Sequence, residues 1–478
     1  MQSPKKSSPD SKTKRVHFIG ICGVGTSAVA TALWSKGFKV TGSDSGFFPP
    51  VSTHLKSIGI PYYPGFHPEK MVEGGVPDFL VVGNAIGTQN PELLYAKEHG
   101  IPFKSFPEVM GEYLVQSHSI VVAGTWGKTT SSALLAHILK SAEWHPSYMI
   151  GGVAQDGSPA AVIDTGDWSV VEGDEYTTAK WDQRAKFMHY RPTHLMLTAV
   201  RWDHADVYPT EESYFDAFRT LICMVPSDEK KGLIVACADN AKITELMNIA
   251  GREYLSYGKS ETALYRYENL SESKDGIDFD IAYHGKTYHV KSPMLGSHNA
   301  ENIAGCFAMA HAIGIAPGDI TDAVKSFHGM KRRLEKRYEH DVTVIDDIAH
   351  SAEKARSVLS TLRRAYHGRI IAVYEPNSGN RTPQSRPQYE NAFKDADEVV
   401  IPRLTKLKVD ETNPEKTFEG DELRDTIASS HPNALYIDDD IALVEHVTKD
   451  RKPGDVIAYL GSHGFRGMIE ETVKKLTL

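Results

Sequence analysis

Short apolar runs recur along the chain, and stretches with helical spacing separate most of them. Near the start, the runs at residues 16–19, 38–41 and 79–82 predict strands, and residues 27–36 between the first two predict a helix. A strand, a helix and a second strand in this order form a βαβ unit with parallel strands. The first domain is therefore predicted to be a doubly wound α/β sheet ending near Gln116.

The same alternation continues through the middle of the chain. A β-branched run up to Ala123 predicts a strand, and the helix-forming residues 132–140 follow a short glycine-containing turn. The apolar runs at 168–171 and 194–198 predict further strands of the same sheet. Short alternating segments between about residues 254 and 293 predict a small antiparallel sheet, and a helix is expected to begin near Asn299.

A third α/β domain is predicted at the carboxyl end. Apolar runs at 342–345, 370–374, 398–401 and 456–460 alternate with helical stretches such as 353–366, which favours a mostly parallel sheet with helices on both faces. The predicted domains are 15–116, 117–328 and 329–478. Residues 1–14 are rich in Lys and Ser without an apolar segment, so a disordered tail is expected rather than a secretory signal.

Length and charge narrow the class of protein. At 478 residues the chain is too long for one core, and about three domains are expected. A net charge of -9 argues against nonspecific binding to nucleic acid. The four cysteines lack paired or metal-ligand spacing, which favours reduced thiols. No apolar run approaches the roughly 20 residues that cross a bilayer. A cytoplasmic enzyme is expected.

The turn after Ala123 has the composition of a phosphate-binding loop. Its sequence is Gly124-Thr-Trp-Gly-Lys-Thr-Thr130, between a predicted strand and a predicted helix. Backbone N–H groups of such a turn can hold phosphate oxygens, Lys128 adds a positive charge, and a Thr hydroxyl can bind Mg²⁺. Gly124 and Gly127 stand closer together than the glycines of the common loop. The alternative is a glycine-rich turn with an incidental lysine.

The first predicted strand also runs into a glycine turn. Gly20, Gly23 and Gly25 follow it, and Asp44 follows the second strand. An acid at that position is typical of dinucleotide-binding folds, but the glycine spacing is Gly-x-x-Gly-x-Gly rather than Gly-x-Gly-x-x-Gly. The turn therefore predicts phosphate binding of some kind, and a nicotinamide cofactor is disfavoured.

Acidic and histidine residues follow two strands of the middle domain. Glu172 and Glu175 come after one strand, and Asp203 and His204 come after the next. Ligands of open α/β sheets bind at the carboxyl ends of strands, and Mg²⁺ prefers oxygen ligands. From the residues alone, His204 is more often structural than a metal ligand, and Glu175 and Asp203 are equally consistent with solvated loop carboxylates.

Taken together, these motifs resemble the ATP-dependent muramyl ligases, the Mur ligase family that builds the peptide of bacterial cell-wall precursors. The resemblance spans nearly the whole chain from Arg15 onward. It rests on the following segments in the family's order: 20–25, 124–130, 172–175, 203–204, 298–302, 332–333 and 346–350. It implies a Rossmann-like N-terminal domain, a central P-loop ATPase domain and a Rossmann-like C-terminal α/β domain.

The resemblance also implies the reaction. Members of the family use ATP and Mg²⁺ to form an amide through an acyl phosphate, and the expected substrates are UDP-N-acetylmuramate and a short murein peptide. Segments 174–179, 186–192 and 374–378 resemble members that attach L-alanyl-γ-D-glutamyl-meso-diaminopimelate in peptidoglycan recycling. The alternatives are attachment of L-alanine in de novo peptidoglycan synthesis, a nucleotide-binding relative without ligase activity, and a folylpolyglutamate-type ligase.

Site residues follow from the matched motifs. The catalytic residues implied are Lys128, His204, Arg333 and Asp347. The ATP-binding residues implied are Gly124, Thr125, Gly127, Lys128, Thr129, Thr130, Asn299, Asn302, Arg333, Asp347 and His350. The metal ligands implied are Thr129, Glu172 and His204, and the amine-substrate residues are Glu375, Ser378 and Arg381. Gly20, Gly23, Gly25, Asp44, His67 and Asn84 are expected to hold the UDP-sugar. The alternative role for Asn299 is that of a helix cap, and the alternative for Arg333 is a surface ion pair.

Four positions depart from the family pattern. Trp126 stands where the family usually has His, and Ala199 stands where Asn is common. Ser351 occupies the position of the second His in a His-His-Pro segment, and Asn377 occupies that of an expected Arg. Arg381 is expected to supply the charge that is missing at Asn377. The sequence does not indicate an oligomeric state.

Overall fold

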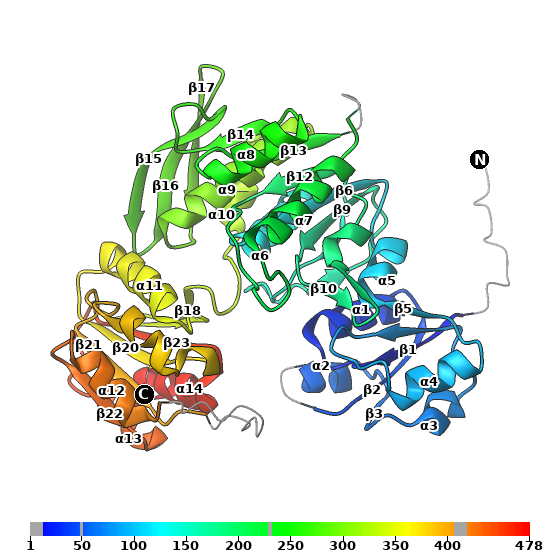
Figure 1. Ribbon diagram of the computed structural model, residues 1–478. Coiled ribbons are helices and arrows are strands. Elements are labelled where there is room, and N and C mark those ends of the chain that lie inside the picture. Colours follow the sequence, from blue (N-terminus) through cyan, green and yellow to red (C-terminus); the bar gives the residue numbers. More distant parts are fainter. Residues whose placement is uncertain (1–12, 48–50, 228–231, 406–417) are drawn as a thin grey trace, which may run out of the picture. The chain divides into compact units, whose positions relative to one another are not determined.

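The computed structural model describes residues 13–47, 51–227, 232–405 and 418–478. The chain forms two compact units. Unit 1 contains residues 1–153, 158–266 and 304–320, and unit 2 contains residues 154–157, 267–303 and 321–478. Figure 1 shows the elements of both units along the chain, and each unit is described separately.

The first sheet of unit 1 is parallel throughout. In spatial order its strands are β3 (Tyr62–Pro64), β2 (Lys39–Asp44), β1 (Arg15–Ile19), β4 (Phe79–Val82) and β5 (Phe103–Ser105). Its helices are α1 (Val24–Ser35), α2 (Val51–Ser57), α3 (Pro68–Glu73), α4 (Pro91–Glu98) and α5 (Phe106–Tyr113). Every residue of β4 is buried, and since side chains alternate along a strand, both faces of the sheet are covered.

The strand order places a topological switch point between β1 and β4, because the chain continues from β1 to one side of the sheet and from β4 to the other. The turns that follow these two strands touch: Gly83 N donates to Ile19 O at 2.9 Å, and the Ile86 side chain packs against Gly20. Ligands of such sheets bind at the switch point, so the fold provides a binding position beside the first glycine turn.

The second sheet has ten strands. In spatial order they are β17 (Lys286–Ser292), β16 (Gly276–Tyr283), β15 (Tyr265–Ser273), β14 (Leu255–Gly258), β13 (Leu233–Cys237), β12 (His194–Leu197), β6 (His118–Ala123), β9 (Trp168–Gly173), β7 (Ser147–Met149) and β8 (Ala161–Val162). From β15 to β7 its pairs are parallel, and β16 with β17 and β7 with β8 are antiparallel. A separate antiparallel hairpin joins β10 (Thr177–Ala179) and β11 (Asp182–Ala185).

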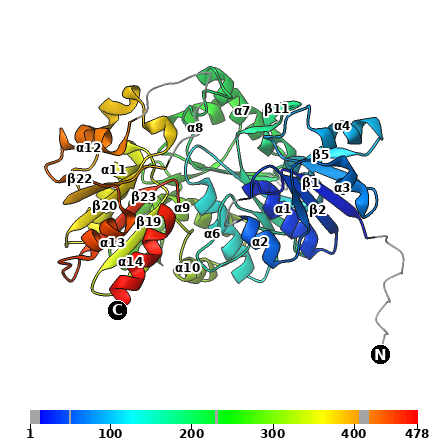
Figure 2. The same cartoon turned by 90° about the horizontal axis from the view of Figure 1, so that it is seen from below.

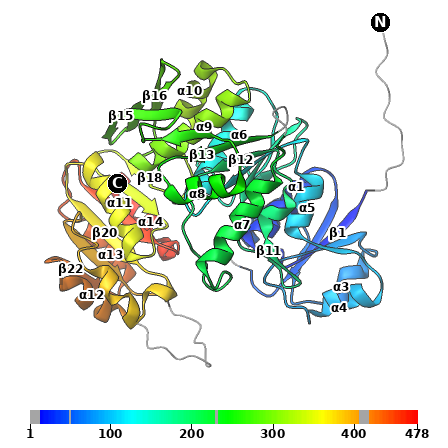
Figure 3. The ribbon, with the colours of Figure 1, turned by 45° about the horizontal axis from the view of Figure 1, so that its top comes forward.

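The helices of this middle part are α6 (Lys128–Ser141), α7 (Glu211–Met224), α8 (Ala241–Ala250), α9 (Ser297–Ala312), α10 (Pro317–Ser326) and the 3-10 helix η1 (Lys186–His189). Helices α7 and α8 pack side by side (Figure 3). Helix α6 leaves β6 directly after the glycine turn, and the strands on either side of β6 are β9 and β12. Residues that follow β9 and β12 therefore lie on both sides of the turn.

The sheet of the carboxyl-terminal part lies wholly in unit 2. In spatial order its strands are β18 (Glu335–Glu339), β19 (Thr343–Asp347), β23 (Val456–Gly461), β20 (Ile370–Glu375), β21 (Glu398–Pro402) and β22 (Ala434–Ile437), and all are parallel except β18. Its helices are α11 (Ala352–Ala365), α12 (Gly420–Ala428), α13 (Asp440–Thr448), α14 (Met468–Thr477) and the 3-10 helices η2 (Ser378–Asn380), η3 (Pro383–Tyr389) and η4 (Phe465–Gly467).

Two apolar clusters cover the two faces of this sheet. Ile345 and Ala372 belong to the cluster that includes side chains of α11 and α12, whereas Val344 and Val373 belong to the cluster that includes side chains of α13 and α14. Neighbouring residues of one strand thus point to opposite clusters, as the period of a strand requires. Helices α13 and α14 lie side by side (Figure 2). The predicted parallel sheet with helices on both faces is confirmed.

Two details differ from the pattern-based prediction. Helix α6 begins at Lys128, earlier than residues 132–140 suggest, because Gly127 in the left-handed region starts the helix within the turn. The predicted small antiparallel sheet is the outer part of the ten-stranded sheet, and β14 pairs with β15 in parallel. The predicted domain boundaries at 15–116, 117–328 and 329–478 stay a prediction. All four cysteines are free, as expected, and no helix in the described residues is long and apolar enough to span a membrane.

Candidate active site

The loop between β6 and α6 requires its two glycines. Gly124 has φ 143° and Gly127 has φ 79°, both in the region that side chains rarely adopt. A Cβ at Gly124 would lie 2.3 Å from Oγ1 of Thr198 and 2.6 Å from the carbonyl oxygen of Ala199. The loop is therefore packed tightly against the segment that follows β12.

Hydrogen bonds hold the loop to that segment. Thr125 N donates to Ala199 O at 2.6 Å, the Thr125 hydroxyl donates to Arg201 O at 2.8 Å, and the Thr198 hydroxyl donates to Trp126 O. The Trp126 indole is 48% exposed and lies 5.9 Å from the Arg201 guanidinium. These bonds use backbone atoms of Trp126 and Ala199, so the two departures from the family pattern leave the loop anchored.

Lys128, the first residue of α6, lies among oxygen atoms. Its ammonium donates to Gly124 O at 2.6 Å and to both oxygens of Glu175 at 3.1 and 2.9 Å. The Glu175 side chain is 1% exposed. A cation at a helix N-terminus is unfavourable unless an anion accompanies it, and Glu175 provides that anion. The lysine is thus held at the loop where a phosphate would bind.

The Thr129 hydroxyl and the Glu172 carboxylate lie next to each other beside the loop. The Thr129 hydroxyl donates to Glu172 Oε1 at 2.9 Å, and Gly151 N donates to Glu172 Oε2 at 2.6 Å. Burial is the largest influence on Glu172 and raises the pKa of its carboxyl. Two oxygens bound to one Mg²⁺ at adjacent octahedral positions lie about 3 Å apart. The pair therefore fits a magnesium ion, which would also compensate the negative charge of Glu172.

His204 lies beside Glu175. Its Nε2 is 3.4 Å from Glu175 Oε1, and this contact is the largest influence raising the pKa of the imidazole. Its backbone has φ 57°, held by a bond from His204 N to the Asp203 carboxylate at 2.7 Å. Glu175 thus links Lys128 to His204, so the residues predicted for phosphate and metal binding in unit 1 are brought together.

An ion pair next to this cluster, between a buried lysine and an aspartate whose side chain is 40% exposed, was missed by sequence reasoning. Lys186 is 7% exposed, and its ammonium donates to Asp174 Oδ2 at 2.5 Å. Burial alone would raise the pKa of Asp174, but Lys186 holds it below its ordinary value. The ammonium also lies 5.5 Å from the rings of Phe106 and Tyr176. A lysine twelve residues from an acid across a hairpin gives no sequence signal for pairing.

The predicted UDP-sugar residues lie at or after the carboxyl ends of strands β1 to β4 of the first sheet. Gly20 has φ 84°, and Asp44 Oδ2 accepts from Cys22 N at 2.8 Å within the glycine turn. Asn84 is the second residue after β4, so it stands across the switch point from Gly20. His67 is partly exposed beside Glu69, with 3.4 Å between their side chains. The remaining predicted residues, Gly23 and Gly25, are in the turn and in the first turn of α1.

In unit 2, Asn299 and Asn302 are bonded to each other. The Asn302 amide donates to Asn299 Oδ1 at 3.2 Å, and the Asn299 amide donates to Leu295 O at 2.8 Å. Both side chains are 7% exposed. Asn299 therefore ties the start of α9 to the preceding chain. The predicted contact of these residues with ATP stays a prediction.

Asp347, at the end of β19, shapes the loop that carries Arg333. Its carboxylate accepts from Leu334 N at 2.8 Å and from Ala349 N at 2.9 Å. Burial raises its pKa to about 6. Arg332 and Leu334 have φ 57° and 49°, so the backbone on both sides of Arg333 is in the left-handed region. The exposed Arg333 side chain is thus carried by a loop that Asp347 fixes.

His350 and Ser351 lie at the start of α11. His350 Nδ1 is 2.7 Å from Ile348 O, and burial lowers the pKa of the imidazole. Ser351 accepts from Lys354 N at 3.3 Å and caps α11. The serine that replaces the family's usual histidine therefore has a structural role as an N-cap.

The predicted amine-substrate residues have different surroundings. Glu375 and Arg381 are 1% and 2% exposed, and their side chains lie 3.4 Å apart. Arg381 also donates to Pro376 O at 3.0 Å and to Thr405 O at 2.8 Å, so its guanidinium is already used by protein acceptors. Arg466, which the sequence did not single out, reaches Glu375 Oε2 at 3.3 Å. Ser378 is exposed. Substrate contact by these residues stays a prediction.

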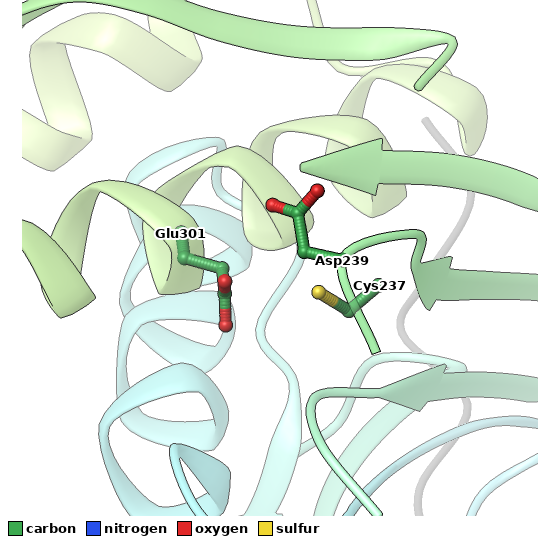
Figure 4. A group of neighbouring side chains, drawn as sticks. All are labelled: Cys237, Asp239 and Glu301. Atoms are coloured by element: carbon green, nitrogen blue, oxygen red, sulfur yellow. The ribbon is translucent and has the colours of Figure 1, made fainter. Parts of the chain in front are cut away.

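Cys237 and Asp239, at the carboxyl end of β13, form another group of potential ligand atoms (Figure 4). The Asp239 carboxylate accepts from Lys259 N at 2.6 Å and from Ser260 N at 2.8 Å. Gly258 lies so close to this carboxylate that a Cβ atom added to Gly258 would be 2.8 Å from Asp239 Oδ2. Asp239 therefore shapes the turn after β14, and this contact accounts for its conformation.

Three family models match consecutive parts of the chain. The Mur ligase family catalytic domain matches residues 15–118, the Mur ligase middle domain matches 122–310, and the Mur ligase glutamate ligase domain matches 332–463. The expected three-domain Mur ligase architecture is thereby confirmed.

Individual relatives align over almost the full chain. The UDP-N-acetylmuramate–L-alanyl-γ-D-glutamyl-meso-2,6-diaminoheptandioate ligase of Escherichia coli is 31% identical over 97% of this chain and 98% of its own. The UDP-N-acetylmuramate–L-alanine ligase of Rhodopseudomonas palustris is also 31% identical, over 94% of each chain. The solved UDP-N-acetylmuramate-alanine ligase of Thermotoga maritima shares the fold, with TM-score 0.78 and 24% identity over 97% and 99% of the two chains. The chain belongs to the Mur ligase family and is an ATP-dependent amide ligase.

Proposed function

We propose that this protein joins UDP-N-acetylmuramate to the tripeptide L-alanyl-γ-D-glutamyl-meso-diaminopimelate in peptidoglycan recycling, with ATP as the source of energy. The observation that carries the proposal is the cluster of Lys128, Thr129, Glu172 and His204 at the carboxyl ends of adjacent strands of one sheet. This cluster joins a phosphate loop to a pair of oxygen ligands, and the N-terminal sheet supplies a second glycine turn.

The reaction needs activation because a carboxylate is a poor electrophile at neutral pH. A lactyl carboxylate oxygen attacks the γ-phosphorus of ATP, the bond to the β-phosphate oxygen breaks, and ADP leaves. The peptide amine then attacks the carbonyl carbon of the acyl phosphate, inorganic phosphate leaves and the amine loses a proton. The first step brings two anions together, so fixed positive charge at the phosphate lowers its barrier.

Each residue of the cluster has a role in this scheme. Lys128 neutralises the β- and γ-phosphates, and the N–H groups of the turn bind their oxygens. Thr129 and Glu172 would hold Mg²⁺, which supplies additional positive charge at the phosphates. His204 is proposed as a ligand of a second metal or as a group that orients the acyl phosphate. Arg333, on its fixed loop in unit 2, is proposed to bind the γ-phosphate.

The choice of tripeptide rests on segments that resemble the tripeptide ligases. Segments 174–179 and 186–192 form one hairpin region, where Lys186 N donates to Tyr176 O at 3.0 Å and the Lys186 side chain pairs with Asp174. A relative named as a tripeptide ligase and one named as an L-alanine ligase are equally similar to this chain, at 31% identity. The L-alanine ligase is therefore the second candidate.

A competition assay separates the two candidates. The protein is given ATP, Mg²⁺, UDP-N-acetylmuramate and equimolar tripeptide and L-alanine, and the products are read by mass. We expect the tripeptide adduct to predominate. A predominant alanyl adduct would assign the protein to de novo peptidoglycan synthesis.

Phosphate release tests ligation itself. We expect inorganic phosphate from ATP only when UDP-N-acetylmuramate and an amine are both present, and the variant Lys128→Ala serves as the negative control. Equal release without the amine would contradict the ligase scheme, and binding without any release would indicate a nucleotide-binding relative. Failure to bind UDP would favour a folylpolyglutamate-type enzyme.

A further inference from the structure

A carboxylate is enclosed in the N-terminal sheet of unit 1. Glu92, the second residue of α4, and His17, in β1, are both 0% exposed. His17 Nε2 lies 3.5 Å from Glu92 Oε2, and His17 Nδ1 lies 2.8 Å from the Thr41 hydroxyl. Neither residue belongs to the phosphate and metal cluster of the second sheet. A buried acid of this kind is costly unless several donors compensate it.

Three donors approach the Glu92 carboxylate at short distance. The Ser43 hydroxyl donates to Oε2 at 2.5 Å, and the Tyr63 hydroxyl and His67 N donate to Oε1 at 2.6 and 2.8 Å. Burial alone would raise the pKa of Glu92, but the bonds from His17, Ser43 and Tyr63 place it below its ordinary value. The side chain therefore connects β1, β2 and β3 with the chain leading into α3.

The residues that Glu92 holds are those that shape the predicted UDP-sugar site. Ser43, whose hydroxyl is bound by Glu92, accepts from Gly20 N at 2.8 Å and from Ile21 N at 3.1 Å through its carbonyl oxygen. The next residue, Asp44, accepts from Cys22 N at 2.8 Å. Glu92 binds His67 directly through its backbone N–H. One buried carboxylate thus fixes both the glycine turn and the position of His67.

Stability alone gives a poor account of this arrangement. Buried ion pairs are often no more stabilising than apolar residues of the same volume, whereas their directional bonds fix a specific geometry. The bonds of Glu92 lead to residues on two sides of one site, and a well-placed second layer of bonds is what holds binding groups in position.

We propose that Glu92, paired with His17, is a positioning residue for the nucleotide-sugar site of the N-terminal sheet. It does not touch the ligand, and acts through Ser43 on the glycine turn and through the backbone of His67. This inference rests on the proposed function, because it takes the ligand of that site to be a UDP-sugar.

The test uses the full-length variant Glu92→Gln. The amide keeps the shape of the side chain but has only one acceptor oxygen, so at least one of the three donors loses its partner. Since a hydrogen bond to a charged group is worth more than an ordinary one, we expect the KM for UDP-N-acetylmuramate to rise at least about tenfold. The KM for ATP and kcat at saturating substrate should stay within about twofold of wild type. Glu98→Gln, at the exposed end of α4, is the matched control.

A milder variant keeps the test decisive if Glu92→Gln does not fold. Tyr63→Phe removes one hydrogen-bond donor to Glu92 and retains the ring. We expect a smaller rise in the KM for UDP-N-acetylmuramate, about threefold, again without a change in the KM for ATP. Unchanged KM for the UDP-sugar, or a parallel loss of kcat and of both substrate affinities, would overturn the inference.

Calorimetric titration with UDP separates this inference from the proposed function. Wild type that binds UDP, together with variants that bind it equally well, would refute only the positioning role of Glu92. Wild type without affinity for UDP would refute the UDP-sugar site itself, and the inference with it. We expect wild type to bind UDP and Glu92→Gln to bind it at least about tenfold more weakly.

Discussion

At the residue scale, Arg332 and Arg333 are neighbours in the chain, yet their guanidinium groups have different surroundings. Arg332 donates to Ser462 O at 2.9 Å and to Gly461 O at 2.5 Å, and lies 3.4 Å from Asp346. The Arg333 side chain is exposed. We expect Arg332→Ala to lower Tm by several degrees, because it leaves acceptors at the end of β23 without a donor.

The variant Arg333→Ala should behave in the opposite way. It removes a charge proposed to stabilise the γ-phosphate, so kcat should fall at least about 10²-fold while Tm stays near the wild-type value. Steady-state kinetics and thermal unfolding of the two variants, measured side by side, check the assignment. A loss of Tm without loss of kcat in Arg333→Ala would place Arg333 outside the site.

Lys128 provides a second prediction at this scale. We expect Lys128→Ala to lower turnover at least about 10²-fold, since its charge is proposed to neutralise the β- and γ-phosphates. Binding of UDP should persist, because the first glycine turn lies in another sheet. Lys140→Ala, at the exposed end of the same helix, is the control and should retain activity. Near-normal turnover in Lys128→Ala would remove the lysine from the proposed mechanism.

At the scale of elements, the hydrophobic pattern predicts the strands well because those strands are buried on both faces. The runs that became β4, β6 and β20 are continuous, apolar and rich in β-branched residues, as is typical of strands in a sheet covered on both faces. The glycine turns were predictable for a related reason, since Gly124 and Gly127 adopt backbone angles that other residues avoid.

Pairings between distant residues were not predictable in the same way. The bond from Gly151 N to Glu172, the pair of Lys186 with Asp174 and the contacts of Glu92 all depend on which strands become neighbours. Strand order is set by packing of whole elements, which single-residue patterns do not encode. The sequence therefore located the candidate site but left its supporting contacts unspecified.

One element gives a prediction about stability. His194, at the start of β12, is 9% exposed and packs against Trp168, with 4.9 Å between the ring centres, and against His118. Burial lowers the pKa of His194 to about 4, from an ordinary value of 6.5. As pH falls, His194 therefore takes up a proton in the unfolded chain at a higher pH than in the folded protein. Stability is lost between about pH 6.5 and pH 4, and the interval between the two pKa values corresponds to about 3 kcal/mol.

Thermal unfolding as a function of pH measures this effect. We expect Tm of wild type to fall more steeply between pH 7 and pH 4.5 than Tm of His194→Gln, which has no proton to take up. The exposed His340, replaced in the same way, should leave the steepness unchanged. Identical pH profiles for wild type and His194→Gln would show that the burial of this ring does not control acid stability.

At the scale of the whole molecule, the chain presents two glycine turns on two different sheets, one after β1 and one after β6. If each turn binds its own nucleotide, the two affinities should be separable by mutation. Asp44→Asn should weaken UDP binding at least about tenfold, because the amide cannot accept from both Cys22 N and Ser45 N. Its affinity for ADP should remain at the wild-type value.

Lys128→Ala should give the reverse pattern, with weakened ADP binding and unchanged UDP binding, and the two variants thus serve as controls for each other. At a UDP-sugar concentration near the wild-type KM both variants should be slower ligases, because the acyl phosphate forms only when the sugar carboxylate and ATP are bound together; saturating UDP-sugar should restore the rate of Asp44→Asn but not that of Lys128→Ala. Calorimetric titration of each variant with UDP and with ADP measures all four affinities. If Asp44→Asn weakened the binding of UDP and of ADP equally, the two turns would belong to a single binding site. The assignment of UDP to the first sheet and of ATP to the second would then be wrong.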